Sequence, residues 1–331
     1  MAMSEFETSK EERLQIAQHF LLSSPPGQFH EVLGDVRKLM KDAILTESLE
    51  TGIARVYNTK NGKVVSAPSG TKTVLSAAGE VDNTHYVDPS NGAVFAIDHI
   101  TLVSLKTKDR SESASPPGGP PTSATSNPNL PFDPHTNTYQ LQTTSEDPIP
   151  SNQDGSLELK RAALQSSVAA YVAHQYSTEH SAGSVYAKNG QLTVCITGEK
   201  PNLRNFWSGK WNSTWTVALA GSTATVTGDI KVHAHYFEDG NLQLQTSKPV
   251  AAAQVAVGSG SESEVAEAVV AHIKSAESTL QSALGEMYAN MNEETLRAMR
   301  RTMPVTRTKM EWNVNAVRMV SQLTTGAAGK G

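Results

Sequence analysis

A single cysteine, Cys195, is found among the 331 residues of the sequence. One cysteine excludes an internal disulfide and any metal cluster held by several cysteines. Because Cys195 lies in the strand-like run Leu192–Ile196, we expect a buried thiol with a structural role. No apolar run approaches the ~18 residues of a membrane span, and the N-terminus lacks the charged and then apolar pattern of a signal peptide. These absences favour an intracellular, soluble protein.

Sequence motifs of catalysis are missing as well. There is no P-loop, no G-x-G-x-x-G after a strand and no H-E-x-x-H. Asp98–His99 comes without a nucleophile pattern, so we interpret this histidine as structural or surface. His233 and His235 share one strand face without a third metal ligand, so we interpret these two histidines as part of a solvated strand face. Glu238–Asp239 precedes a glycine, which is typical of a turn. We therefore expect no enzyme activity, no metal and no cofactor.

A large excess of one charge is also missing from the chain as a whole. The net charge is -5, so the molecule is not a general polyanion binder. Between Thr295 and Arg318, however, the sequence contains six basic residues and only one acidic residue, Glu311. The basic residues are Arg297, Arg300, Arg301, Arg307, Lys309 and Arg318. Any surface that binds anions is therefore expected to be confined to one part of the chain.

Apolar residues at spacings of three and four predict several helices. Such patterns cover Ser9–Phe20, Gln28–Lys41 and Leu157–Tyr176, and a long helix opens at Ser259–Ser261. A shorter helical piece is expected at Ile44–Leu49. From about residue 53 to residue 103 the pattern is mixed and strand-like.

Further along the chain the apolar period changes to two, which predicts an antiparallel meander of about five strands. Asn189–Gly190 between two alternating runs is the strongest short-range signal of a hairpin. Alternation from Trp215 onward predicts a strand, with Trp207 and Trp211 packing near its entry. We interpret these three tryptophans as a structural aromatic cluster. Polar residues on the other face of the strands suggest one solvated side.

These elements together predict an α+β fold. N-terminal helices precede a central antiparallel meander, a long C-terminal helix crosses the sheet, and a basic segment follows. The expected regions are 1–106 for the N-terminal helices and mixed part, 107–156 for a flexible insert rich in Ser, Pro and Gly, 157–290 for the sheet with its helices, and 291–331 for the basic segment. The long apolar surfaces of a single meander suggest a partner subunit.

The basic segment has several interpretations. A solvated charged face is one of them. An acidic protein groove, nucleic-acid phosphates and anionic lipid headgroups are the candidate ligands, and composition alone does not separate these three. The acidic total and the lack of a stacking platform argue against nucleic acid.

Several stretches of the sequence resemble one known family, the α subunit of F-actin-capping protein. Two look like its signature stretches, His235–Leu242 and Leu296–Lys309. Shorter blocks follow the same order along the chain: Arg13–Ala17, Pro25–Gly27, Asp35–Arg37, Phe95–His99 and Asn205–Trp211. Two features depart from the family's pattern, the Ser/Pro/Gly insert and the weakly apolar tail after Trp312.

The resemblance implies a non-catalytic function. Family members form an obligate heterodimer of α and β subunits, which binds the barbed end of an actin filament and blocks subunit addition and loss. The C-terminal segment of each subunit acts as a "tentacle". Matched onto this sequence, the actin-binding residues are Arg297, Arg300, Arg301, Arg307 and Lys309. Inhibition by phosphoinositides and a place in the cytoplasm, at the cortical actin cytoskeleton, are also implied. The alternative is a regulator whose basic tail binds phosphoinositides or nucleic acid.

Overall fold

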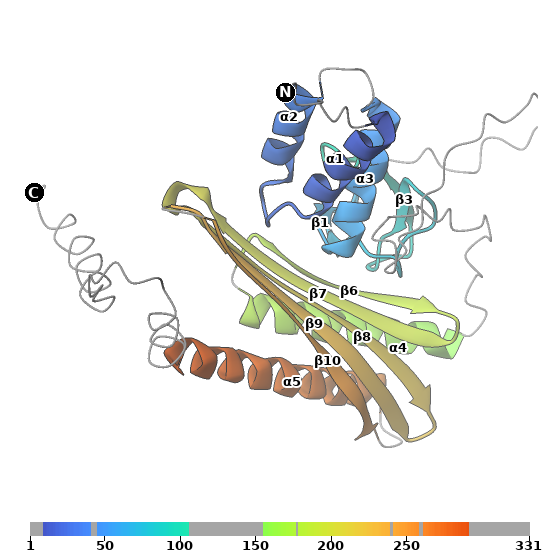
Figure 1. Cartoon of the computed structure of the whole chain (residues 1–331). Helices are drawn as coiled ribbons and strands as arrows, with labels where there is room; N and C mark the ends of the chain where they lie inside the picture. Colours follow the sequence, from blue (N-terminus) through green and yellow to red (C-terminus); the bar gives the residue numbers. More distant parts are fainter. Residues whose placement is uncertain are drawn as a thin grey trace, which may run out of the picture. The chain divides into compact units, whose positions relative to one another are not determined.

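The structure, a computed structural model, describes residues 9–40, 45–105, 155–176, 178–238, 241–257 and 261–290. Contacts divide the chain into two units, Met1–Glu277 and Ser278–Gly331. In the first unit, a five-stranded antiparallel sheet carries long helices on one face and the N-terminal helices and short strands on the other (Figure 1). The second unit is described only for the last turns of the final helix, up to Asn290.

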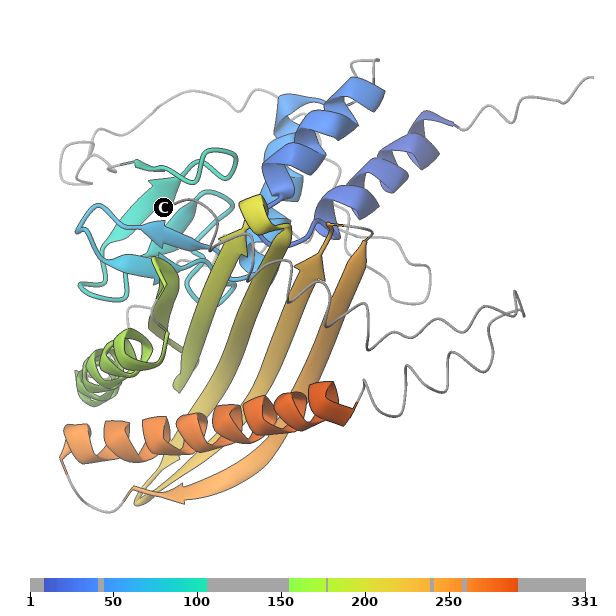
Figure 2. The same cartoon turned by 90° about the vertical axis from the view of Figure 1, so that its left-hand side faces the viewer.

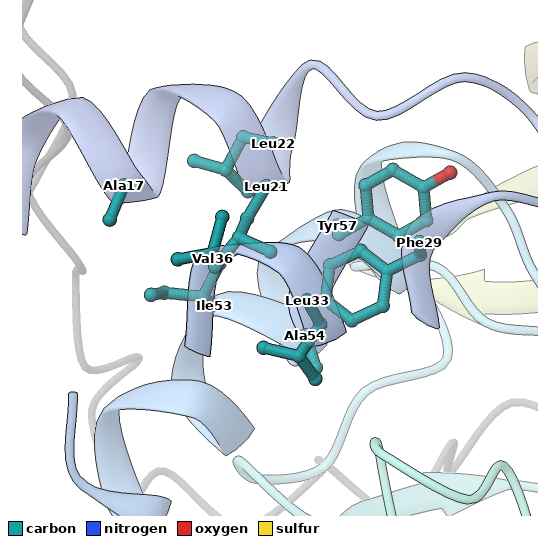
Figure 3. Close-up of a cluster of buried hydrophobic side chains, with 9 residues drawn as sticks. All are labelled: Ala17, Leu21, Leu22, Phe29, Leu33, Val36, Ile53, Ala54 and Tyr57. Atoms are coloured by element: carbon teal, nitrogen blue, oxygen red, sulfur yellow. The ribbon is translucent and has the colours of Figure 1, made fainter. Parts of the chain in front are cut away.

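Three helices open the chain: α1 (Lys10–Leu22), α2 (Phe29–Leu39) and α3 (Glu47–Lys60). A capping box starts α1, because the Ser9 side chain accepts from the Glu12 backbone and the Glu12 carboxylate accepts from the Ser9 N–H. One apolar cluster joins the three helices, and the stacked rings of Phe29 and Tyr57 lie 4.6 Å apart within it (Figure 3). The sequence prediction was wrong for residues 53–60, which continue α3. Ile53, Ala54 and Tyr57 recur at helical spacing and are buried, so the packing of these residues holds the helix together.

Short strands follow the helices. β1 (Val64–Ser66) pairs with β2 (Lys72–Val74), and β4 (Val94–Ile97) pairs with β3 (His85–Val87) and β5 (Ser104–Leu105), all antiparallel. A second apolar cluster fixes most of these strands. Its buried residues are Val65, Ala67, Leu75, Tyr86, Phe95 and Ile97.

The main sheet is the predicted meander. It contains β6 (His180–Lys188), β7 (Gln191–Asn202), β8 (Trp207–Ala220), β9 (Thr223–Tyr236) and β10 (Leu242–Ala256), in the order β10-β9-β8-β7-β6. Asn189 and Gly190 both have positive φ angles, 54° and 73°, as a type I′ hairpin turn requires. The predicted start of β8 at Trp215 was wrong. The strand already begins at Trp207, because the ladder to β7 satisfies its backbone in spite of an unfavourable glycine and asparagine.

Two helices cover the apolar face of the sheet: α4 (Gly155–Gln175) and, up to Glu277, α5 (Glu262–Asn290) (Figures 1 and 2). Trp215 on β8 packs edge to face on His272 of α5, with the ring centroids 6.5 Å apart. The Glu277 carboxylate accepts hydrogen bonds from Tyr171 at 2.7 Å and from Ser213 at 2.5 Å. The predicted position of the long helix across the apolar face is thus confirmed. Of the described helices, none is both long and apolar enough to cross a membrane.

The opposite face of the sheet is polar, as predicted, but it is not simply solvated. The N-terminal strands cover part of it: Ser184 accepts from the Val74 N–H at 2.9 Å, and the Tyr186 hydroxyl donates to the Val74 carbonyl at 2.7 Å. Beneath this cover Cys195 is buried, which raises the pKa of its thiol to about 11. The expected structural thiol is confirmed.

Candidate functional site

The predicted actin-binding residues lie outside the part of the chain that the structure describes. Arg297, Arg300, Arg301, Arg307 and Lys309 all follow residue 290, where that part ends. Their role therefore stays a prediction. The structure does describe the sheet and the helices that precede this segment in the chain. They include a row of tryptophans on β8, a contact between the start of α2 and the end of the sheet, a buried ionic cluster and an open sheet edge.

The three tryptophans of β8 form a row along one face of the strand. Their spacing of four is a multiple of the strand period of two, so all of them point to the same side of the sheet. Trp215 is completely buried, whereas Trp207 and Trp211 are half-buried. At ~3.3 Å per residue, rings four positions apart are about 13 Å from each other along the strand, so the row is not one compact cluster. Lys200 places its Nζ 6.0 Å from the centre of the Trp207 ring.

Two of the stretches that resemble the family, Pro25–Gly27 and His235–Leu242, lie close together where α2 begins beside the end of the sheet. Gly27 has a φ of 79°, and a Cβ there would lie 3.1 Å from Pro201 Cβ, so a glycine allows this close approach. Next to it, Gln28 Nε2 is 2.9 Å from His235 Nδ1. Asn241 Oδ1 lies 3.1 Å from the other nitrogen of His235, and Phe237 stacks on the imidazole. The expectation of a solvated His235 was wrong, because this helix and this turn bury the ring.

Asp98 and His99 serve the fold. The Asp98 carboxylate accepts from the Ile100 N–H and the Thr101 hydroxyl, both at 2.8 Å. His99 is buried, with its Nε2 3.0 Å from the Asn83 carbonyl oxygen. Each side chain therefore holds a turn of the helices and short strands within residues 9–40 and 45–105, which we call the N-terminal module.

A buried ionic cluster ties the same module to the sheet. Lys63 Nζ lies 2.8 Å from both carboxylate oxygens of Glu199, and Lys210 Nζ lies 3.1 Å from one of them. Glu199 and Lys210 are direct partners on β7 and β8. Burial alone would raise the pKa of Glu199, but Lys210 and Lys63 lower it to about 2. Burial, together with the second positive charge of Lys63, lowers the pKa of Lys210 to about 8.

Replacing Glu199 by glutamine is expected to lower the free energy of unfolding by about 2–3 kcal/mol, because two lysine charges then lack their carboxylate. Denaturant unfolding at pH 7 measures this. The folded pKa of about 2 lies below the ordinary glutamate value of 4.5, so the contribution is present above pH 4.5 and is lost as the pH falls toward 2. The difference in the free energy of unfolding between the wild type and Glu199→Gln should therefore disappear as the pH falls toward 2.

The matched control is Glu179→Gln, the same substitution at an exposed position. A double variant, Glu199→Met with Lys210→Met, should recover part of the loss because it removes one charge of each sign. An effect of Glu199→Gln no larger than that of Glu179→Gln would show that the cluster contributes nothing to stability.

The edge strand β10 is the most exposed part of the sheet. Most of its side chains are open to solvent, and Leu242 is 68% exposed. Among the described residues no strand pairs with its outer side. A long, exposed edge strand offers a row of backbone donors and acceptors to another chain. On α1, Ile16 and Phe20 are exposed apolar residues as well.

Comparison with known proteins gives the family. The sequence model of the F-actin capping protein alpha subunit matches residues 17–117 and 132–322. The F-actin-capping protein subunit alpha of Dictyostelium discoideum is 31% identical over 310 residues, which cover 92% of this chain and 94% of the relative. The corresponding protein of Caenorhabditis elegans is 31% identical over 313 residues, 93% of this chain and 95% of its own.

A solved structure has the same fold. It is described as a homodimeric actin capping protein alpha subunit from Plasmodium berghei, with a TM-score of 0.64 and 20% identity, over 89% of this chain and 98% of the other. The fold agrees with the sequence matches, which place the chain in the class of F-actin capping proteins. The chain belongs to the F-actin capping protein alpha subunit family. The resemblance found in the sequence is confirmed, and the gap in the family match, residues 118–131, lies inside the stretch predicted as an insert.

Proposed function

We propose that this chain is the α subunit of a heterodimeric capping protein that binds the barbed ends of actin filaments and blocks subunit addition and loss. The observation that carries the proposal is the extent of the family match. It spans most of the chain and continues through the basic segment to residue 322. The function requires binding and no chemical step.

The partner we propose is the β subunit of capping protein. The open edge of β10 and the exposed Ile16 and Phe20 supply two surfaces that a second subunit would bury. An obligate pair buries on the order of 2,000 Å² or more, which one strand edge alone does not provide. A partner that both extends the sheet and packs on the N-terminal helices accounts for both surfaces.

In the mechanism we propose, one set of residues determines the rate of association with the filament end and another determines the rate of dissociation. The basic residues Arg297, Arg300, Arg301, Arg307 and Lys309 attract an acidic surface of the terminal actin subunits, which raises the association rate. Apolar contacts of the tails of both subunits set the dissociation rate. Phosphoinositides, which carry clustered phosphates, compete for the same basic segment. The site of action is then the cytoplasmic actin cytoskeleton, at the cortex.

Co-expression of this chain with a β subunit tests the proposal. We expect a soluble one-to-one complex by light scattering, and inhibition of elongation at barbed ends at substoichiometric amounts. A well-folded monomer from expression of the chain alone would contradict the obligate heterodimer. A stable pair of two copies, as the description of the Plasmodium berghei protein states for that protein, would replace the β subunit by a second copy of the chain. Binding to phosphoinositide vesicles or RNA without any effect on filament ends would favour the alternative regulator.

A further inference from the structure

One acidic side chain interrupts the apolar contact between α5 and the sheet. Within the first unit, the buried residues of α5 are Ala266, Val269, Ile273 and Glu277. Their spacings of three and four place all of them on one face of the helix. Glu277 is only 4% exposed, so its carboxylate lies in the same buried row as the aliphatic side chains. Burying a carboxylate costs free energy unless hydrogen bonds replace those to water.

Three hydroxyl groups supply these hydrogen bonds, and they come from two other elements of the fold. Ser213 of β8 donates to Glu277 Oε1 at 2.5 Å. Tyr171 of α4 and Tyr176, the residue that follows α4, both donate to Oε2 at 2.7 Å. Burial, and after it the charge of Glu277, raises the pKa of both tyrosines, so their hydroxyl groups stay protonated. Hydrogen bonds from a hydroxyl group to a carboxylate are of the strong, charge-assisted kind.

The three donors lie at fixed places in a layer that is otherwise largely apolar. In the strand register Ser213 lies between Ile196 of β7 and Ile230 of β9, and all three side chains are completely buried. Tyr176 lies against β7, because a Cβ added to Gly198 would fall 2.6 Å from its ring. The carboxylate on α5 therefore finds three donors together at one position of this face.

An apolar row alone does not fix how far a helix lies along a sheet. Val269 and Ile273 are four residues apart, about one helical turn, so a shift of α5 by one turn would place one aliphatic side chain where another had been. The same shift would carry Glu277 about 6 Å away from its three donors, at a rise of about 1.5 Å per residue. Buried polar groups would then lack partners, which is costly. A single buried polar residue fixes the register of a coiled coil for the same reason.

We propose that Glu277 sets the register of α5 on the sheet and is thereby a positioning residue for the basic segment. The helix crosses the strands (Figure 2), and in the sequence the chain continues from it to Arg297, Arg300 and Arg301. A helix held in one register starts this segment from one place, whereas a helix with two registers divides it between two places. The register does not depend on capping, but its consequence for filament ends rests on the function proposed above.

The distance between two spin labels tests the register, measured by pulsed electron spin resonance on the full chain in the form in which it purifies. One label is attached at Lys188→Cys, in the β6–β7 turn, and the other at Lys274→Cys, an exposed position of α5. Cys195 is buried and stays unlabelled. With Glu277 in place we expect one narrow distance distribution.

The decisive variant is an apolar one, Glu277→Leu combined with Ser213→Ala, Tyr171→Phe and Tyr176→Phe. It removes every polar group of the network together and leaves none of them unpaired, so we expect it to stay folded. Without the network, a second population should appear, displaced by roughly 5–6 Å, the length of one helical turn. A network that served stability alone would not produce this second distance in the folded protein.

Two further variants separate the register from other effects. Glu277→Gln should restore most of the narrow distribution, because an amide accepts from hydroxyl groups and also donates to them. Glu267→Leu, a matched change at an exposed position of α5, should leave the distribution as it is. If the apolar variant is not recovered folded, Tyr171→Phe with Tyr176→Phe removes two of the three donors and should broaden the distribution. One unchanged distance in both of these network variants, or equal broadening by Glu267→Leu, would overturn the proposal.

Inhibition of barbed-end elongation tests the positioning role separately. A register that is correct in only half of the molecules lowers the apparent affinity for filament ends about twofold, and one that is correct in a tenth lowers it about tenfold. The apolar variant should therefore cap more weakly than Glu267→Leu, with Glu277→Gln closer to the wild type. A second register with unchanged capping would overturn the positioning role. A wild-type complex without any effect on filament ends would contradict the proposed function and leave the distance result standing.

Discussion

Trp215→Ala is expected to lower the free energy of unfolding by about 3–5 kcal/mol, the range for removing a large aromatic side chain from a core. Trp215 is completely buried, between the sheet and His272 of α5. Its ring also lies directly over the next strand, because a Cβ added to Gly228 would fall 2.3 Å from the indole. The loss of the ring therefore leaves a cavity that the neighbouring backbone cannot fill.

The measurement is denaturant unfolding of the purified complex, with Trp207→Ala as the matched control on the same strand. Trp207 is half-buried, so its removal should cost clearly less. Trp215→Phe provides a milder variant if the alanine variant is not recovered folded. Equal losses from Trp207→Ala and Trp215→Ala would contradict the difference in burial that the structure shows.

Gly228→Val is the complementary change. Its branched side chain would enter the space that the Trp215 indole occupies, so we expect a loss similar to that of removing the ring. The close contact between Gly228 and the Trp215 indole explains why a glycine occurs within the long alternating strand β9. Sequence periodicity alone does not explain this glycine, because its cause is a contact with a residue on the neighbouring strand.

Elements with a local cause were predictable from the sequence. The helix at the N-terminus has its capping box within four residues, and the β6–β7 hairpin has its Asn189–Gly190 turn. The extent of α3 and the start of β8 were not predictable in the same way. Residues 53–60 are helical because Ile53, Ala54 and Tyr57 pack on α1 and α2, and β8 begins early because β7 pairs with it.

The sites that depend on distant residues had no local signal. Lys63 and Glu199 are separated by 136 positions in the chain and meet only because the N-terminal module lies on the polar face of the sheet. Gln28 and His235 are 207 positions apart. The sequence blocks next to Gln28 and around His235 were recognisable as a resemblance, but their contact at one end of the sheet is a result of the fold. For the basic segment the opposite holds: its composition is evident in the sequence, but it lies beyond the residues that the structure describes.

Arg300→Ala with Arg301→Ala is expected to weaken capping by roughly 10- to 100-fold, because about one charge-assisted contact, worth on the order of 1.5–3 kcal/mol, is lost. The two arginines share a face with Arg297 if the predicted helix forms there. Barbed-end elongation measures the loss at several concentrations of the complex. Because exposed charges steer association, the association rate should fall and its dependence on salt should become weaker.

The control for this prediction is a double variant of equal charge change within the described part, Lys10→Ala with Lys188→Ala, both at exposed positions. It should cap like the wild type. Light scattering must show that the arginine variant still forms the complex, since the proposed subunit contacts, the β10 edge and α1, lie far from these residues in the sequence. An intact complex with unchanged elongation kinetics would remove Arg300 and Arg301 from the actin contact and leave the family assignment standing. Loss of the complex itself would instead place the basic segment in the subunit interface.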